Sequence, residues 1–356
     1  MQLGVNLGYW GAGDDAGNLE LAREADRLGY AVVWVAEAYG SDAPTVLAWV
    51  AAQTSRVDVG SAVMQIPART PATTAMTAAT LDTLSQGRFR LGLGISGPQV
   101  SEGWHGVRFD FPLDRTREYV DVVRLALSRR PVSYQGDHHV LPLPDGPGKA
   151  LRLTVVPVRE RLPVYLASLG PRNLELTGEI ADGWLGLFVS AEHVGDSLDR
   201  IRAGRARAGL DGLDGFDVCA SAPLVITPEG PEAEVVEAGA EPVKAYAALY
   251  LGGMGSRTQN FYNALARRMG YEEAAEQVQQ AYLDRRPRDA EAAVPTEFVD
   301  RTSLLGPVTR VAGRMAELAD AGVTTLSVTP VAPDLAGRVS MLRSAAQALE
   351  ASGRAS

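Results

Sequence analysis

Short apolar runs alternate with helical patterns along nearly the whole chain, and this alternation limits the possible folds more than any other feature of the sequence. The runs are rich in branched residues and end in Gly, Pro or small polar residues. Near-continuous apolar runs are typical of strands buried on both faces of a parallel sheet. We therefore predict eight strands, at residues 2–6, 31–36, 57–63, 89–94, 163–167, 183–189, 218–226 and 323–328.

A helical pattern follows each predicted strand. In the first of them Leu21, Ala25 and Leu28 recur at helical spacing, and Gly29 follows as a residue suited to end a helix. The sequence indicates helices at 18–28, 45–53, 72–85, 114–128, 171–181, 191–208, 306–321 and 335–351. Eight strand-then-helix units predict an α/β fold of the (β/α)₈ TIM-barrel type. A doubly wound sheet is the alternative, but it does not require eight strands so evenly paired with helices.

Two stretches interrupt the alternation. Residues 131–161 are rich in Pro and Gly and contain a short apolar segment, 133–141, that is typical of a hairpin. Residues 229–303 are mostly helical, with predicted helices at 241–251, 258–269 and 272–284. We expect both stretches to be insertions in βα loops, on the catalytic face of one TIM-barrel domain that spans residues 1–356.

The composition excludes several classes of protein. The 34 basic and 43 acidic residues give a net charge of −9, which argues against a nucleic-acid surface because such a surface needs clustered basic residues. No apolar run approaches the roughly 18 residues of a membrane-spanning helix, and no signal peptide is visible. The one cysteine, Cys219, cannot form an internal disulfide and fits a cytoplasmic location.

The segment 92–97, Gly-Leu-Gly-Ile-Ser-Gly, matches the G-x-G-x-x-G pattern of dinucleotide-binding proteins. That pattern binds a dinucleotide only when its glycines open a helix directly after a strand. Here Pro98 follows, and no helical pattern begins before Asp114. Gly92 and Gly94 therefore indicate either a tightly packed strand or a strand end that a planar ring can approach closely.

Two other strand ends are candidates for ligand contacts. Residues 167–171, Ala-Ser-Leu-Gly-Pro, end the fifth predicted strand and open a helix, where backbone N–H groups and the helix dipole can hold a phosphate. A plain strand-to-helix junction is the alternative. The Gly/Ser/Ala run in residues 60–67 could place a bulge or a strained peptide against a ligand ring.

The histidines do not form a pattern typical of a metal site. His138 and His139 have no carboxylate or Cys at ligand spacing, so we expect no metal and regard them as residues of the surface hairpin. His105 differs, because it follows the fourth predicted strand beside Trp104 and close to Glu102. A loop in that position lies on the catalytic face of a barrel, which makes His105 and Glu102 candidate catalytic residues.

Taken together, these motifs resemble the luciferase-like family and, within it, the oxidoreductases that depend on the deazaflavin coenzyme F420. Flavin mononucleotide (FMN) monooxygenases of the family share the same motifs. The segments that carry the resemblance are 33–39 (Val-Trp-Val-Ala-Glu-Ala-Tyr), 60–69, 86–97, 103–106 (Gly-Trp-His-Gly), 181–184 (Ala-Asp-Gly-Trp) and 306–326.

The resemblance implies a barrel with the ring of the cofactor lying over the C-terminal strand ends. It places a non-prolyl cis peptide behind the ring at Ala62–Val63. It further implies contacts to the ring system or side chain from Glu37, Gln65, Ile95 and Ser96, and a phosphate contact at Leu169, Gly170 and Pro171, next to Ser168. A homodimer is what relatives suggest.

The chain also departs from the sugar-phosphate dehydrogenases of the family. Those enzymes carry Asp-His where this chain has Glu37-Ala38, and a catalytic Glu where this chain has Gly97. The segment 94–106 is more similar to methylenetetrahydromethanopterin reductases, although Asn6 stands where their first strand carries an acidic residue. The resemblance therefore does not identify the substrate.

These observations lead us to expect an F420-dependent oxidoreductase that moves a hydride between the deazaflavin C5 and a small organic substrate of the C=C, C=N or carbonyl type. Candidate proton donors are Glu102, His105, Glu37 and Tyr39, and Trp10 and Trp104 are candidate walls of the substrate pocket. An FMN-dependent monooxygenase that uses O₂ is the first alternative. A non-enzymatic member of the fold that binds flavin is the second.

Overall fold

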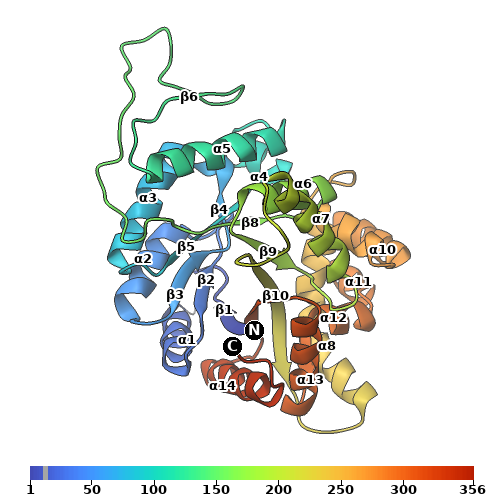
Figure 1. Cartoon of the computed structure of the whole chain (residues 1–356). Helices are drawn as coiled ribbons and strands as arrows, with labels where there is room; N and C mark the ends of the chain where they lie inside the picture. Colours follow the sequence, from blue (N-terminus) through green and yellow to red (C-terminus); the bar gives the residue numbers. More distant parts are fainter. Residues whose placement is uncertain (11–14) are drawn as a thin grey trace.

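A closed parallel barrel forms the centre of the molecule (Figure 1). The computed structural model describes residues 1–10 and 15–356, and in that part of the chain eight strands form the ring. Strand β10 pairs with both β9 and β12, and β12 pairs with β1, which closes the sheet and confirms the TIM barrel over the doubly wound alternative. The barrel strands are β1 (Gln2–Asn6), β2 (Val32–Val35), β3 (Asp58–Ser61), β5 (Phe89–Gly94), β8 (Val164–Ala167), β9 (Gly183–Leu187), β10 (Asp217–Ile226) and β12 (Thr325–Pro330).

Helices surround this barrel and follow the predicted order. They are α1 (Asp15–Leu28), α2 (Ala43–Gln53), α3 (Pro71–Leu84), α5 (Pro112–Leu127), α6 (Pro171–Ile180), α7 (Val194–Arg207), α13 (Val308–Asp320) and α14 (Leu335–Ala351). Local chemistry explains several ends: Asp42 caps α2 by accepting from the Thr45 N–H at 2.9 Å, and Gly29 follows α1 with a φ of 79°.

Short elements that sequence patterns did not indicate complete the fold. Strand β4 (Met64–Gln65) pairs with β5, and β11 (Leu304–Gly306) pairs with β10. A single 3₁₀ turn, η1 (Ile66–Ala68), follows β4. Helix α4 (Pro98–Gly103) begins directly after Gly97, so the expectation of no helix before Asp114 was wrong. A six-residue helix is too short for a periodic apolar face, which is why the sequence pattern did not reveal it.

Two layers of side chains hold the barrel together. Side chains that point outward from the strands, such as Val5 and Val35, pack with the helices in the main hydrophobic core. Side chains that point inward form a separate cluster around Trp34, Tyr165 and Cys219. The Trp34 ring fits because Gly60 has no side chain: a Cβ there would lie 2.3 Å from the ring.

A charged cluster closes the N-terminal end of the barrel. The Arg90 guanidinium lies 2.8 Å from a carboxylate oxygen of Asp58 and 3.2 Å from one of Asp217, and it also donates to the Tyr165 hydroxyl. Burial lowers the pKa of Arg90, but its contacts with Tyr165, Asp58 and Asp217 outweigh burial and raise it. This end of the barrel is therefore filled by paired charges.

The first inserted stretch forms the predicted hairpin but lies in a different connection from the one expected. Strands β6 (Tyr134–Gln135) and β7 (Val140–Leu141) pair antiparallel, and the hairpin extends away from the barrel (Figure 1). Residues 131–161 join α5 to β8, so they are an αβ connection and not the βα insertion that we expected. The Glu118 carboxylate on α5 accepts N–H groups of residues 137, 138 and 139 and so ties the hairpin back along that helix.

The second inserted stretch joins β10 to α13 and is therefore a βα insertion, as predicted. It forms its own hydrophobic cluster, and its residues Leu265 and Met269 line a small cavity together with Val194 and Ser197 of α7, so the insertion lies beside α7 (Figure 1). Its elements are α8 (Glu232–Ala248), a π-helical turn η2 (Leu249–Gly253), α9 (Phe261–Arg268), α10 (Glu272–Leu283), α11 (Pro287–Ala292) and α12 (Thr296–Thr302).

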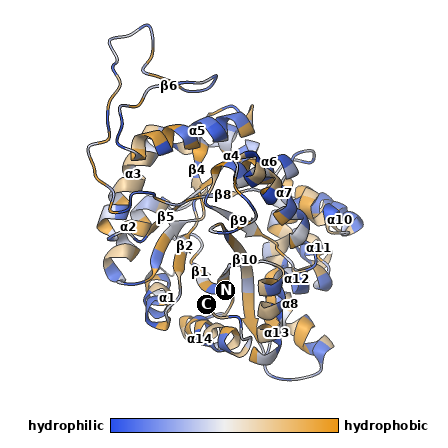
Figure 2. Cartoon of the chain, in the orientation of Figure 1, coloured by the Kyte–Doolittle hydropathy of each residue, from blue (hydrophilic) through white to orange (hydrophobic). Residues whose placement is uncertain are grey.

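Hydropathy follows this arrangement. The central strands are mostly apolar, whereas outer helices such as α5 and α10 carry many hydrophilic residues (Figure 2). In the described part of the chain, no helix combines the length and the apolar character that crossing a bilayer requires.

The close approach of β3 and β5 leads to a stability prediction. A Cβ at Gly92 would lie 1.8 Å from the backbone oxygen of Ser61 and 2.9 Å from Leu185. We expect Gly92→Ala to lower the free energy of unfolding by about 3 kcal/mol or more, because backbone atoms must move. Gly313→Ala in α13 is the control: nothing lies within 4 Å of its Cβ position, so we expect a gain of up to about 1 kcal/mol. Urea unfolding measures both, and equal stabilities for the two variants would contradict the prediction.

Candidate functional site

The C-terminal end of the barrel is open to solvent. Side chains alternate along a strand, and the inward residues Asn6, Ala36, Ala62, Ala167, Leu187, Ser221 and Thr329 near the strand ends are partly exposed. Gly94 on β5 and Pro223 on β10 are inward too but buried, as are outward neighbours such as Val35 and Leu166. Apart from Leu187, the partly exposed residues are small or polar, and we call this end of the barrel its mouth.

One wall of this mouth is built by the end of β3 against β5. The Ala62–Val63 peptide is cis, which confirms the expected backbone geometry at this position. Ser61 Oγ donates to the Gly92 carbonyl at 2.8 Å and accepts from the Gly92 N–H at 3.0 Å. Gly94 leaves room beside the cis peptide, because a Cβ there would lie 2.5 Å from a Val63 methyl. The result is a flat surface of backbone and small side chains.

Glu37, just after β2, is held by an ion pair that joins two loops, those after β2 and β3. Both of its oxygens accept from the Arg69 guanidinium, at 2.6 and 2.7 Å, and its side chain is only 7% exposed. It also accepts the backbone N–H groups of Gln65 and Ala43, both at 3.1 Å. With every acceptor direction engaged, Glu37 acts here as an anchor for the loops after β2 and β3.

Arg69 connects this anchor to a second carboxylate. It donates to Asp42, the N-cap of α2, and its hydrogen bond with Glu37 is the main cause that raises its own pKa. Burial would raise the pKa of Asp42, but hydrogen bonds from Thr45 and the charge of Arg69 outweigh burial and lower it. The Arg69 guanidinium therefore bridges the carboxylates of Glu37 and Asp42 and holds them in one geometry.

A second polar chain runs across the same wall. Gln65 Nε2 donates to Ser96 Oγ at 2.7 Å, and Gln65 Oε1 lies 2.8 Å from His105 Nε2. Since Oε1 is an acceptor, His105 Nε2 carries a hydrogen in this arrangement. Ser96 has a φ of 58°, a conformation that is uncommon for a residue other than glycine and is often found at functional sites. The structure thus brings Gln65, Ser96 and His105 together, beside the partly exposed Ile95.

Other predicted residues lie apart from this network. Glu102 is exposed on α4 and accepts the Phe109 N–H at 3.0 Å, so it organises its own loop. Tyr39 is 60% exposed. Trp104 is 66% exposed, so it is not a packed wall of a substrate pocket. Trp10 is partly buried, and its backbone N–H donates to Ser41 Oγ.

The junction of β8 and α6 forms the second predicted contact region. Gly170 is the N-cap of α6, Pro171 begins the helix, and no side chain caps it, which leaves first-turn N–H groups available. The Ser168 hydroxyl is buried and hydrogen-bonded to the Thr177 hydroxyl at 2.8 Å. The backbone groups of the neighbouring residues are therefore the ones left to face outward. Arg268, from α9 of the insertion, donates to the Leu169 carbonyl at 2.9 Å and brings a positive charge to this junction.

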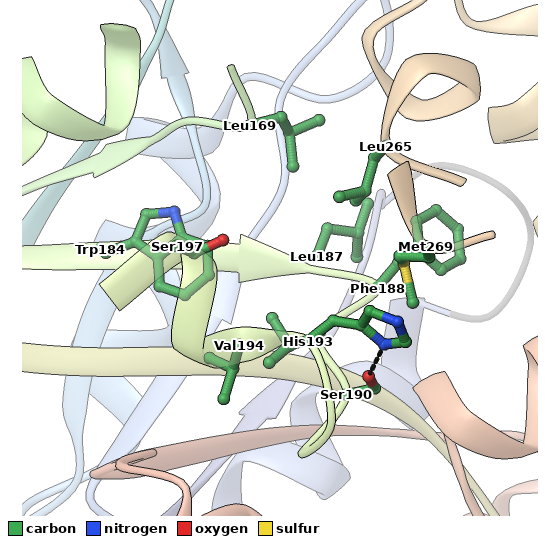
Figure 3. A pocket seen from close by; sticks show the side chains of 11 residues that line it. Leu169, Trp184, Leu187, Phe188, Ser190, His193, Val194, Ser197, Leu265 and Met269 are labelled. Atoms are coloured by element: carbon green, nitrogen blue, oxygen red, sulfur yellow. Dashed lines mark hydrogen bonds between the residues drawn. The ribbon is translucent and has the colours of Figure 1, made fainter. Parts of the chain in front are cut away.

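A small cavity lies behind the same junction (Figure 3). Its volume is about 30 Å³, which is room for one or two waters. It is lined mainly by apolar side chains, with Leu169 and Leu187 on the barrel side and Leu265 and Met269 from the insertion. His193 borders it and is bonded to Ser190 at 2.9 Å. The apolar lining suits a packing defect better than a binding site for an anion.

Sequence patterns missed several residues of the site. Local sequence patterns did not indicate Arg69 or Arg268. Their partners, Glu37 and the Leu169 carbonyl, lie 32 and 99 residues away in the sequence. The described residues contain no group of three or more His, Cys, Asp or Glu side chains placed to hold a metal ion. His138 and His139 lie in the hairpin turn against Glu118.

The Arg69–Glu37 pair leads to a second prediction. Arg69→Gln leaves a buried carboxylate without its cation, and we expect it to lower the free energy of unfolding by about 3–5 kcal/mol. Arg23→Gln is the matched control, because the Arg23–Glu20 pair is 43% and 51% exposed and such pairs contribute about 0–1 kcal/mol. Chemical unfolding of both variants measures the difference. Equal losses of unfolding free energy in the two variants would show that the buried Glu37 carboxylate does not need Arg69 as its counter-ion.

Comparisons with known proteins concern the family and the overall fold. A family model described as luciferase-like monooxygenase matches residues 10–325. A Mycobacterium tuberculosis protein provisionally named as a coenzyme F420-dependent oxidoreductase is 43% identical over 335 residues, 92% of this chain and 95% of that protein. The 5,10-methylenetetrahydromethanopterin reductase of Archaeoglobus fulgidus is 26% identical over 87% of this chain and 88% of its own length. The solved structure of the coenzyme F420-dependent tetrahydromethanopterin reductase from Methanopyrus kandleri aligns with a TM-score of 0.79, at 25% identity and over 96% of both chains.

Proposed function

Because the chain belongs to the luciferase-like monooxygenase family, we propose that it is an enzyme that binds coenzyme F420 and transfers a hydride between its C5 and a small organic substrate. The substrate would carry a C=C, C=N or carbonyl group. The observation that carries this proposal is the 43% identity, over 92% of the chain, to a protein named for dependence on coenzyme F420.

The residues of the barrel mouth fit a flat ring. Ala62 and Gly94 have a small side chain or none, and the partly exposed Ile95 adds an apolar group next to Gly94. Gln65 and Ser96 would orient polar edges of the ring, and Glu37 would hold the loop that carries Gln65. These roles rest on hydrogen bonds that already exist between the protein groups.

The α6 N-terminus fits the phosphate of the cofactor. Backbone N–H groups at Leu169, Gly170 and the first turn can point to an anion, and the helix dipole favours it. Arg268 uses one donor on the Leu169 carbonyl and has further N–H groups to offer. Since the whole chain has a net charge of −9, such local groups must hold an anionic cofactor.

When bound, the deazaflavin would deliver a hydride from C5 in its reduced form or accept one at C5 in its oxidised form. The protein positions the substrate, excludes water and controls a proton. His105 is the best placed of the candidate proton carriers, because Gln65 orients its Nε2 and leaves Nδ1 free to face other groups. Tyr39 remains a candidate, whereas Glu37 is fully engaged and Glu102 organises its own loop.

An FMN-dependent monooxygenase is the second candidate function, because the matching family model is described as a monooxygenase. A titration followed by fluorescence separates the two. We expect binding of F420 that is at least tenfold tighter than binding of FMN. Tighter binding of FMN, with O₂ consumption when reduced FMN is supplied, would contradict the proposal. Failure to bind either one would favour a non-enzymatic protein.

A charge at the α6 N-terminus tests the phosphate site. Nothing lies within 4 Å of a Cβ at Gly170, and its φ is −80°, so a side chain fits there. Gly170→Asp would place a negative charge against the phosphate and should weaken F420 binding by about tenfold or more. Gly170→Asn, of equal size and without the charge, is the control, and both residues are good N-caps. If both variants bind F420 equally well, the phosphate lies elsewhere.

We also propose a homodimer that works in the cytoplasm. Exposed apolar side chains on α2 and α3, namely Trp49, Met76 and Leu84, offer a surface for a second copy of the chain. The buried position of Cys219 fits a reducing compartment. A monomeric mass in light scattering at micromolar concentration would contradict the dimer.

A further inference from the structure

A short chain of hydrogen bonds joins three segments at the barrel mouth, and none of its members is a carboxylate, a lysine or an arginine. Gln65 Nε2 lies 2.7 Å from Ser96 Oγ, and Gln65 Oε1 lies 2.8 Å from His105 Nε2. Gln65 belongs to β4, Ser96 lies between β5 and α4, and His105 follows α4. One amide therefore links a hydroxyl that precedes a short helix to an imidazole that follows it.

The surrounding structure holds Gln65 in place. The residue is only 3% exposed, and β4 pairs it with Gly94 at the end of β5. Its backbone N–H donates to the Glu37 carboxylate at 3.1 Å, and the Arg69 guanidinium holds that carboxylate in turn. Both ends of the side-chain amide are hydrogen-bonded. Because leaving a buried polar atom unpaired costs free energy, the amide acts as a rigid connector.

The Ser96 hydroxyl keeps a hydrogen to donate. An amide nitrogen only donates, so Gln65 Nε2 donates to Ser96 Oγ, and the hydroxyl hydrogen needs a different acceptor. Within the part of the chain that the structure describes, no hydrogen bond uses that hydrogen. Ser96 is partly exposed and has a φ of 58°. Its hydrogen is therefore available to a ligand at the mouth.

The same amide decides which ring nitrogen of His105 carries a hydrogen. Gln65 Oε1 only accepts, so His105 Nε2 carries the hydrogen, and Nδ1 of the neutral ring is an acceptor. No described residue bonds to Nδ1, and His105 is partly exposed. The protonated ring also carries a hydrogen on Nε2. His105 can therefore gain and lose a proton at Nδ1 while its bond to Gln65 stays intact.

An uncharged partner suits a histidine that must change its protonation state. A carboxylate beside the ring would favour the protonated form, whereas an amide orients the ring without that electrostatic preference. The carboxylates of the neighbouring loops have other partners: Glu37 pairs with Arg69, and Glu102 accepts the Phe109 N–H. The amide of Gln65 is thus the group that sets the direction of the His105 ring.

We propose that Gln65 is a positioning residue that makes His105 a proton carrier through Nδ1, for a carbonyl or alcohol oxygen of the substrate. The inference rests on the proposed function, because the same substrate would exchange the hydride. A carbonyl oxygen has two lone pairs, so it can accept from the Ser96 hydroxyl and from a protonated His105 together.

The proton and the electrons balance in both directions. In reduction the carbonyl carbon gains the hydride of reduced F420, and the oxygen gains the proton of His105 Nδ1. The C=O π bond is replaced by a C–H and an O–H bond, and the ring of His105 is left neutral with its hydrogen on Nε2. In oxidation of the alcohol, the hydroxyl proton returns to Nδ1 as the hydride leaves the carbon.

The first test uses the full-length protein with ¹⁵N-labelled histidine and without cofactor. The chain has four histidines, and His105→Asn assigns the NMR signals of His105. At a pH where the ring is neutral, the wild type should carry its hydrogen on Nε2, in slow exchange with water. Gln65→Met, of similar length and without the amide, should make this exchange fast. A hydrogen on Nδ1 in the wild type, or the same exchange in both proteins, overturns the inference.

Gln65→Glu provides the second variant, because it keeps the size and the acceptor oxygen and adds a charge. A carboxylate in this position should raise the pKa of His105 by about one unit or more in an NMR titration. Gln99→Glu is the matched control: it adds the same charge to α4, where Gln99 is exposed, and should change the titration much less. Equal pKa values of His105 in the two variants would contradict the contact between Gln65 and the ring.

The third measurement is kcat against pH for cyclohexanone with reduced F420. Gln65→Glu should move the alkaline limb of this profile upward by the same amount as the NMR titration. Gln65→Met should lower kcat by about tenfold or more, which is part of the roughly 10²–10⁴-fold that a positioned proton carrier contributes. A residue that only tied α4 to the barrel would not move the limb, so an unmoved limb beside a shifted titration overturns the role of His105.

The two proposals fail in different ways. If F420 does not bind but the ring hydrogen and its titration respond to Gln65 as expected, the positioning of His105 stands and the proposed cofactor is wrong. If F420 binds and cyclohexanone is reduced with a pH profile that ignores Gln65→Glu, the proposed function stands and the positioning role is wrong.

Discussion

The contact between Ser61 and Gly92 sets how closely strands β3 and β5 approach, and the candidate site depends on that approach. The Ser61 hydroxyl bonds both the N–H and the carbonyl of Gly92, and any side chain at Gly92 would overlap the Ser61 backbone. From this point the chain continues through the cis peptide Ala62–Val63 to Gln65. Gln65 in turn meets Ser96 and His105, so one wall of the barrel mouth follows from one close backbone contact.

Electrostatics in this protein is local. The net charge of −9 would repel an anionic ligand at long range, but salt screens such a field within about 8–10 Å. The positive groups near the mouth are placed differently: Arg69 is neutralised by Glu37 and Asp42 and serves to hold loops, whereas Arg268 has only a carbonyl as its partner. The helical insertion thereby supplies a cation to a strand end of the barrel.

Much of this arrangement was predictable from local patterns. The bounds of β1, β5 and α14 agree with the predictions to the residue, because each has a long apolar or periodic pattern with clear stop signals. Helix α4 was missed because six residues cannot show a period, and β11 because it pairs only with the end of β10. The hairpin itself was predictable, but its placement in a βα loop was wrong. The predicted helix 114–128 before it and the predicted strand 163–167 after it already made it an αβ connection, as the structure shows. The gathering of Gln65, Ser96 and His105 agrees with candidates named from the family resemblance, whereas their contacts with a ligand stay predictions.

The sequence by itself determined the order of strands and helices, the family and the short strand-end motifs, because these depend on periodicity and on neighbouring residues. Only the tertiary structure decided which of the candidates can act. In the fold Glu37 pairs with Arg69, Glu102 accepts an N–H of its own loop, and Arg268 donates to the Leu169 carbonyl. The fold also packs Phe188, at the end of β9, against Tyr246, Tyr250 and Tyr262 of the insertion. Closure of the barrel produces such contacts by placing strand ends from the whole chain around one mouth, and no pattern of local spacing records which side chains then meet.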